Sequence, residues 1–321
     1  MNIKQSIDHL LAPGTMLDEQ VQIIAELNQH QFDAEVLTAL AEALLEQCQK
    51  VTGISKNAVD LVGTGGDGHD TLNFSTLGAI VAAAAGTPMI KHGSKSATSR
   101  CGSFDLLQQM HVPMPEDNQS VKKIFKEFHL AFLFAPFFHP VMKRVVAARA
   151  VFAEKGKRTI FNILGPLINP ARPSKIVLGV YTPQLIDPMV EALQNLGVES
   201  AYVVHGAGLD EFSLTGKSEY ACLHRGHIER DTFDSSTLGL EHCDVSELVG
   251  GAPEENLMQS EQILAGKLSG PKTDMVCLNA AAAIQVGSDF ELSWAESLDQ
   301  AKNALSSGKA HELLQAMQHY E

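Results

Sequence analysis

The sequence lacks the usual features of secreted, membrane-spanning and metal-thiolate proteins. It has only five cysteines in 321 residues, and they are scattered, with no Cys-x-x-Cys pair. This excludes a disulfide framework and predicts free thiols in a reducing compartment. No run approaches 18 apolar residues, and the first residues do not read as a leader segment. We therefore expect a cytoplasmic protein with no membrane partner.

Acidic residues are missing from two long central segments, although the chain as a whole is acidic. The net charge is −14, which argues against nucleic acid as the main partner. Residues 71–104 contain no Asp or Glu, and residues 128–186 contain only Glu154, beside eight Lys and Arg residues. This distribution favours a small polyanionic ligand bound locally, in a protein whose outer surface stays acidic.

The stretch 60–76 combines a strand, a glycine-rich loop and the start of a helix. A short apolar run at 58–62 predicts a buried strand, and four glycines follow within six residues. Glycines let backbone N–H groups approach an oxyanion closely, and the following helix adds the positive end of its dipole. We expect Ser75 or Thr76 to cap that helix or to bind a phosphate. The stretch predicts an anion cradle, with a purely structural turn as the alternative.

Two common nucleotide sites are excluded at this loop. Gly63, Gly65 and Gly68 match G-x-G-x-x-G, but a dinucleotide site needs an acid about 20 residues further on. None is present, because no Asp or Glu occurs between Asp70 and Asp105. The chain also has no G-x-x-x-x-G-K-[ST] motif. The expected ligand is therefore phosphorylated, but it is neither NAD nor an ATP bound by a P-loop.

From residue 58 onward, short apolar strands alternate with helical segments. This pattern predicts an α/β fold with a mostly parallel sheet flanked by helices. The expected parallel strands are 58–62, 88–91, 131–134, 175–181 and 200–205. Short antiparallel strands are expected at 211–215, 221–224 and 226–228.

The first 54 residues have the apolar period of helices, with Asp33 as a predicted N-cap. We expect a small all-helical domain at 1–54, joined by a segment around 139–157, and an α/β domain at 55–321. A helical hairpin of this size cannot bury its apolar faces alone. It needs either the main domain or a second copy of the chain to cover them, and we expect a homodimer.

The informative clusters all follow predicted strands, where ligands bind in open α/β sheets. Asp210 and Glu211 are adjacent in a glycine loop, and two carboxylates facing phosphate suggest Mg²⁺ between them, with a solvated turn as the alternative. Ser75 could join that metal, and Asp67 could contact the metal or a ribose hydroxyl. Arg149, in a predicted helix with an apolar face, suits a carboxylate ligand. We assign no residue as general acid or base.

Five motifs, in this order, resemble those of the anthranilate phosphoribosyltransferase family. They read GTGGDG with NFST, KHGSKSATSRCGSFDLL, FLFAPFFHPVMK, RTIFNILGPLINP and VVHGAGLDEFSLTG. The resemblance implies a nucleoside phosphorylase-like fold of the class IV glycosyltransferases, with a small helical domain hinged to an α/β domain, and a homodimer. It also implies Mg²⁺-dependent transfer of phosphoribose from phosphoribosyl pyrophosphate (PRPP) to anthranilate, with release of pyrophosphate, in tryptophan biosynthesis.

The resemblance also implies three groups of site residues. Those implied to contact PRPP are Gly63, Gly66, Asp67, Thr71, Asn73, Ser75, Thr76, Lys91, Lys95, Ser99 and Ser103. Those implied on the anthranilate side are Gly63, His92, Ser94, Arg149 and Pro166. Those implied to bind Mg²⁺ are Ser75, Asp210 and Glu211.

One departure from the family pattern keeps other functions open. The KHG run of the family is followed by Asn-Arg, and here it is followed by Ser94-Lys95. That Asn helps to place anthranilate, and a serine has no amide. The alternatives are a related transferase or phosphorylase that uses PRPP or a nucleoside with another acceptor, a non-catalytic nucleic-acid-binding relative, or a PRPP sensor.

Overall fold

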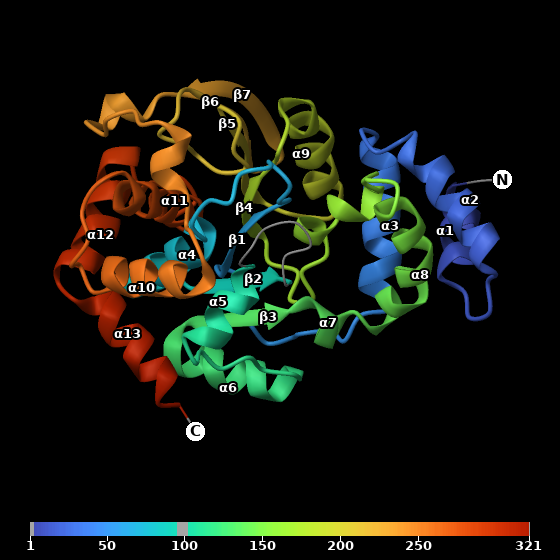
Figure 1. Cartoon of the computed structure of the whole chain (residues 1–321), viewed down its shortest axis with the longest axis horizontal. Coiled ribbons are helices and arrows are strands. Elements are labelled where there is room, and N and C mark those ends of the chain that lie inside the picture. The colour runs from blue at the N-terminus through green and yellow to red at the C-terminus, as the bar shows by residue number, and fades with distance from the viewer. Residues whose placement is uncertain (1–2, 95–101, 321) are drawn as a thin grey trace.

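The computed structural model describes residues 3–94 and 102–320 (Figure 1). A seven-stranded sheet forms its centre, in the order β3-β2-β1-β4-β5-β6-β7. The strands are β1 Val59–Gly63, β2 Met89–Gly93, β3 Leu130–Phe134, β4 Lys175–Gly179, β5 Ser200–Gly206, β6 Ser218–His224 and β7 His227–Phe233. Strands β1 to β5 are parallel, and β6 and β7 are antiparallel. The α/β class with a mostly parallel sheet is confirmed.

Helices cover both faces of this sheet and form a separate lobe at one side (Figure 1). They are α1 Ile3–Leu11, α2 Leu17–Asn28, α3 Ala34–Glu46, α4 Phe74–Ala84, α5 Ser103–Gln109, α6 Asn118–Phe128, α7 Ala135–Phe138, α8 Val146–Ala153, α9 Ile186–Asn195, α10 Pro253–Leu264, α11 Pro271–Gly287, α12 Trp294–Ser306 and α13 Lys309–Gln318. Helices α4, α11, α12 and α13 share one hydrophobic cluster with the sheet. Helix α9 belongs to a second cluster, which also contains side chains of β4 and β5.

The lobe consists of α1, α2, α3 and α8, as Figure 1 shows. Asp33 caps α3, as predicted, because its carboxylate accepts from the N–H groups of Glu35 and Val36 at 2.9 and 3.4 Å. The apolar face of α3 is completely buried, and its side chains join those of α9 in one cluster. The lobe therefore buries its apolar face against the α/β layer. A domain boundary near residue 54 stays a prediction.

The five expected parallel strands are all present, with ends displaced by at most two residues. The expected strand at 211–215 is wrong, because this segment consists of bends and irregular backbone. Its backbone N–H groups bond to side chains rather than to a neighbouring strand: Phe212 donates to Asn279 at 3.1 Å, and Ser213 donates to Ser218 at 3.1 Å. A ladder cannot form when side chains already take its donors.

Strand order reverses at β1, which lies between β2 and β4. The chain adds β2 and β3 on one side of β1 and then returns to add β4 and β5 on the other. At such a switch point, the loops at the carboxyl ends diverge and leave a crevice. Gly63 at the end of β1 is in register with Gly179 at the end of β4, so the two loops that follow them start side by side.

Candidate active site

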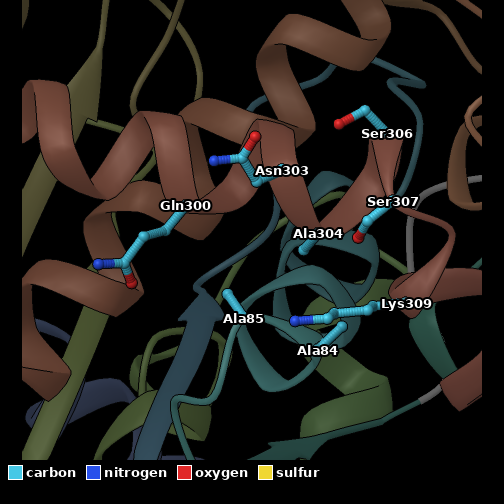
Figure 2. Close-up of a pocket in the computed structure, with 8 residues that line it drawn as sticks. All are labelled: Ala84, Ala85, Gln300, Asn303, Ala304, Ser306, Ser307 and Lys309. Carbon is cyan, nitrogen blue, oxygen red and sulfur yellow. The ribbon is translucent and has the colours of Figure 1, made fainter.

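A cavity of about 680 Å³ opens at the carboxyl ends of β1, β2 and β5. A smaller hollow of about 410 Å³ lies between the end of α4 and the junction of α12 and α13 (Figure 2). The polar side chains that line the smaller hollow are exposed or partly exposed, so it is an ordinary surface depression. The larger cavity is lined by buried and charged groups from widely separated segments, which makes it the candidate site.

The glycine loop, residues 63–68, forms one wall of this cavity. Gly65, Gly66 and Gly68 have φ of 66°, 83° and 86°, a left-handed conformation that residues with a side chain rarely adopt. Asp67 accepts from the backbone N–H of His69 at 3.0 Å, which closes the end of the loop. The loop thereby brings its backbone, rather than side chains, to the cavity surface, as the anion-cradle prediction requires.

The start of α4 differs in detail from the prediction. Asn73 occupies the N-cap position, so neither Ser75 nor Thr76 caps the helix. The backbone N–H of Ser75 donates to the carboxylate of Glu211 at 3.2 Å. Thr76 is completely buried inside α4 and does not line the cavity, unlike the other predicted site residues that the structure describes.

The acidic loop, residues 206–211, crosses the ends of β4 and β5 at very close range. A Cβ on Gly179 would lie 1.5 Å from the carbonyl oxygen of Asp210, and one on Gly206 would lie 2.0 Å from that of Glu211. A Cβ on Gly63 would lie 2.2 Å from Oδ2 of Asp210. All three strands therefore need glycine where this loop passes. Sequence reasoning missed Gly179, although a glycine within the apolar run of the expected strand 175–181 was visible.

Two side chains hold the acidic pair to the rest of the site. Oδ2 of Asp210 accepts from the backbone N–H of Gly65 at 2.6 Å, which ties the acidic loop to the glycine loop. The side chain of Asn279, in α11, donates to the carbonyl of Phe212 at 2.9 Å and accepts from its N–H. Asn279 is 1 % exposed, so this pairing is shielded from water. The carboxylates therefore have fixed positions before any ligand arrives.

The two carboxylates of the acidic loop have unusual proton affinities. Burial, together with the nearby carboxylate of Asp67, raises the pKa of Asp210 to about 7. Burial and the charge of Asp210 raise the pKa of Glu211 well above its ordinary value. Oε2 of Glu211 is buried and has no hydrogen-bond partner among the described residues. A cation between these groups would lower both pKa values, so the donor set fits a hard divalent metal.

The metal prediction rests on these two carboxylates and one hydroxyl. Across residues 3–94 and 102–320, no group of three or more His, Cys, Asp or Glu side chains has a metal-binding arrangement. Mg²⁺ needs fewer protein ligands than that, since it is usually bound through one or two carboxylates with ligand phosphate and water completing the shell. The role of Ser75, Asp210 and Glu211 as its ligands stays a prediction.

Lys91 is a buried cation that interacts electrostatically with both carboxylates of the acidic pair. It is 2 % exposed, and its Nζ donates to the carbonyl of Leu61 and, at 3.1 Å, to the hydroxyl of Ser75. Burial lowers its pKa, while the charges of Asp60 and Glu211 act in the opposite direction. Lys91 therefore places a positive charge directly beneath the start of α4.

The other side of the cavity, which we call the imidazole half, is formed by His92, His139, Arg149, Phe161 and Pro166. The rings of the two histidines meet edge to face, with centroids 5.2 Å apart. Burial lowers their pKa values to about 3 and about 4, so both are neutral near pH 7. Nδ1 of His92 lies 3.2 Å from the carbonyl oxygen of Gly165, which joins the end of β2 to the Pro166 segment.

Arg149 projects from α8 into this half of the cavity. Its guanidinium carbon lies 5.6 Å from the centroid of the Phe161 ring, and burial lowers its pKa. No ion pair of Arg149 with a carboxylate occurs among the described residues. A guanidinium over an aromatic ring, in a partly apolar pocket, suits a planar ligand with a carboxylate.

The structure also adds Arg158 and Tyr181 to the cavity wall, which the sequence did not single out as site residues. The guanidinium of Arg158 donates to the carbonyl of Gly66 and lies 4.6 Å from the centroid of the Tyr181 ring. The surplus of basic residues in 128–186 was the signal that could have found Arg158. The predicted Lys95 and Ser99 lie outside the described residues.

Comparison with known proteins defines the class of this site. A sequence model described as "Glycosyl transferase family, a/b domain" matches residues 55–311. The anthranilate phosphoribosyltransferase of Petrotoga mobilis is 41 % identical over 284 residues, with 88 % of this chain and 81 % of that protein covered. The enzyme of Francisella philomiragia is 38 % identical, with 98 % and 93 % covered. Fold and site together therefore define a glycosyltransferase.

Solved structures give the same result at the level of the fold. The anthranilate phosphoribosyltransferase of Thermus thermophilus has a TM-score of 0.90 and 35 % identity, with 98 % of this chain and 93 % of that chain covered. The enzyme of Saccharomyces cerevisiae, solved in complex with PRPP and Mg, has a TM-score of 0.85 and 29 % identity, with 98 % and 90 % covered. The chain belongs to the anthranilate phosphoribosyltransferase family, and the resemblance of its motifs is confirmed.

Proposed function

We propose that the protein transfers phosphoribose from PRPP to the amine of anthranilate and releases pyrophosphate, a step toward tryptophan, with Mg²⁺ as cofactor. One observation carries the proposal: the glycine loop, Lys91 and the acidic pair share a single cavity with the imidazole half. A phosphorylated sugar fits the first group and an aromatic carboxylate fits the second. Membership of the anthranilate phosphoribosyltransferase family supports this substrate pair.

The reaction forms a bond between the amine nitrogen and the anomeric carbon of the ribose. The bond from that carbon to pyrophosphate breaks, and pyrophosphate leaves with the electron pair. The glycine loop offers backbone N–H groups to the phosphates, and Lys91 adds a buried positive charge. Bound at Ser75, Asp210 and Glu211, Mg²⁺ would neutralise charge on the leaving pyrophosphate.

The chain contributes to the acceptor side mainly by orientation. Arg149 binds the carboxylate of anthranilate, and His92 and Pro166 hold the ring, so that the amine faces the anomeric carbon. An aromatic amine loses its proton readily after attack, so this mechanism assigns no general base. The predicted contacts of Thr71, Asn73 and Ser103 with PRPP belong to the same proposal, since all three line the cavity.

The direct test mixes protein, PRPP, Mg²⁺ and anthranilate and follows the fluorescence of anthranilate. Loss of fluorescence that requires all four components supports the proposal. Reactions that omit one component at a time, and a reaction with EDTA, are the controls. Binding of PRPP without consumption of anthranilate would contradict the acceptor and leave the PRPP site standing.

A second candidate is transfer to a different acceptor, favoured by Ser94. This residue is exposed at the end of β2 and lines the cavity. If anthranilate is the acceptor, Ser94→Asn should lower its apparent KM and leave the KM for PRPP unchanged. If the unmodified chain consumes no anthranilate and Ser94→Asn does, the different acceptor is supported.

A homodimer completes the proposal. Large apolar side chains are exposed on and near the helical lobe, with Met16 68 %, Val146 57 % and Phe32 49 % exposed. A second copy could cover them. Light scattering after size-exclusion chromatography tests this, and a mass near 34.6 kDa would contradict it.

We also place the protein in the cytoplasm. Cys48, Cys222, Cys243 and Cys277 are free thiols, which suits a reducing compartment. In the part of the chain that the structure describes, no helix is both long and apolar enough to cross a membrane.

A further inference from the structure

His205, near the end of β5, bonds to two backbone groups through its ring. Nδ1 lies 2.8 Å from the carbonyl oxygen of Val180, just after β4, and Nε2 lies 3.2 Å from the amide nitrogen of Gly208. A carbonyl only accepts and an amide N–H only donates. Nδ1 must therefore carry the proton, and Nε2 must present its lone pair. The two contacts fix the orientation of the ring and the role of each of its nitrogens.

The ring holds a turn that does not form easily on its own. Ala207 has φ of 49° and Gly208 has φ of 104°, so two successive residues are left-handed and one of them has a Cβ. Gly206 and Leu209 exchange backbone hydrogen bonds of 2.9 and 3.2 Å across the turn. Both Ala207 and Gly208 are exposed, so burial does not hold the turn in place.

The turn leads directly into the acidic pair. Leu209 is buried, and Asp210 follows it at once, with its carbonyl oxygen against Gly179. On the far side of the pair, Asn279 holds Phe212. The two carboxylates therefore lie between one side-chain clamp at residue 208 and another at residue 212. At residue 208 the clamp is one imidazole nitrogen, while the hydroxyl of Thr215 donates to the carbonyls of Gly206 and Ala207 at the longer distances of 3.5 and 3.4 Å.

We propose that His205 is a positioning residue: its hydrogen bonds to Val180 and Gly208 fix the turn 206–209 and, through it, the metal-binding geometry of Asp210 and Glu211. The inference rests on the proposed function, which supplies the cation. It gives His205 no contact with substrate. Its role is to reduce the number of loop conformations that the cation would otherwise have to select from.

Three substitutions separate the two bonds of the ring. His205→Ala removes both. In His205→Gln, the amide oxygen reaches the position of Nε2 and can accept from Gly208. In His205→Asn, the amide nitrogen reaches the position of Nδ1 and donates only to Val180. His30→Ala, in an exposed turn between α2 and α3, is the matched control.

The first measurement is hydrogen–deuterium exchange in the metal-free protein, read on peptides that span residues 206–212. His205→Ala and His205→Asn should exchange faster there by about tenfold, the effect of losing one hydrogen bond. His30→Ala should match the unmodified chain, and His205→Gln, which keeps the bond to Gly208, should stay closer to it than the other two variants. Equal exchange in all four variants would overturn the proposal, and so would faster exchange throughout the sheet, which indicates a general structural role.

The second measurement is Mn²⁺ binding, followed by electron paramagnetic resonance with PRPP present. The dissociation constant should rise about five- to thirtyfold in His205→Ala and His205→Asn, and His205→Gln should recover most of the affinity. Unchanged affinity in His205→Ala would overturn the proposal. If the unmodified chain does not bind Mn²⁺, the metal site of the proposed function is contradicted. The exchange data then decide by themselves whether His205 holds the turn.

Discussion

The two halves of the cavity respond to burial in opposite ways. In the carboxylate half, formed by the glycine loop and the acidic loop, burial raises the pKa of Asp210 to about 7. In the imidazole half, burial lowers the pKa of His92 to about 3 and that of His139 to about 4. The physical cause is the same, since a poorly hydrated site disfavours charge of either sign. One half thereby gains affinity for a cation, and in the other half both imidazoles are neutral beside the guanidinium of Arg149.

The halves also differ in construction. The acidic loop reaches its place because Gly63, Gly179 and Gly206 have no Cβ, and its contacts are mainly to backbone groups. The imidazole half is made of large side chains packed against one another, including the His92–His139 pair. Where backbone segments touch, one added carbon atom should cause a large loss of activity and stability. Where side chains pack against one another, a single substitution should cause a smaller loss. The following predictions test this difference, beginning with the largest expected effect.

Removal of both charges of the acidic pair should nearly abolish turnover. Asp210→Asn with Glu211→Gln should lower kcat/KM at ordinary Mg²⁺ by roughly a thousandfold or more, because the electrostatic stabilisation of the leaving group is lost. The assay is anthranilate fluorescence. The control is Glu254→Gln with Glu255→Gln, an exposed pair at the start of α10, and it should leave kcat/KM unchanged. Retained activity in the first variant would refute the metal assignment.

An added methyl group should distinguish the two halves directly. Gly179→Ala places a Cβ 1.5 Å from the carbonyl oxygen of Asp210, so the acidic loop must move. We expect about a hundredfold loss of activity and destabilisation by about 1–3 kcal/mol, the range for overpacking. Gly165→Ala, in the imidazole half, meets no atom within 4 Å and should melt like the unmodified chain. Thermal melting and kinetics measure both, and equal losses would remove the contrast.

Arg149→Ala should affect only one substrate. Loss of a charge-assisted pair costs about 1.5–3 kcal/mol, so the apparent KM for anthranilate should rise about 10- to 100-fold while that for PRPP changes little. Lys157→Ala, exposed and outside the cavity wall, is the control. A similar rise in both KM values would contradict the assigned role of Arg149.

The smallest effect concerns stability against pH without ligands. The pKa values of His92 and His139 are lowered on folding, so the unfolded chain binds more protons below pH 6.5, and stability should fall as the pH drops toward 4. The contribution of Asp210 to the pH dependence of stability has the opposite sign, because its raised pKa should lower stability as the pH rises from 4 to 7. In urea unfolding, the free energy of unfolding of His139→Phe should fall with a weaker slope as the pH drops below 6.5. The total difference from the unmodified chain should be roughly 1–3 kcal/mol. An unchanged slope would mean that His139 is not neutral in the folded protein.

Much of this molecule could be read from local patterns. The apolar runs that become β1 to β5 and the Asp33 cap have the expected places, because burial on both faces of a sheet and helix capping act over a few residues. The same holds for the glycine loop and for the acid-free segments, whose composition indicated a phosphorylated ligand. The motifs of the five segments were sufficient to identify the family, which the relatives confirm.

Other features were decided only by the tertiary structure. The segment 211–215 resembles a strand, yet Asn279 and Ser218 take its backbone donors, and these partners lie 67 and 5 residues away. The proton affinities of Asp210 and His92 depend on burial that no local pattern specifies. The reason is physical: propensity and pattern describe each residue with its neighbours in sequence, whereas desolvation and close backbone approach arise only when distant segments meet.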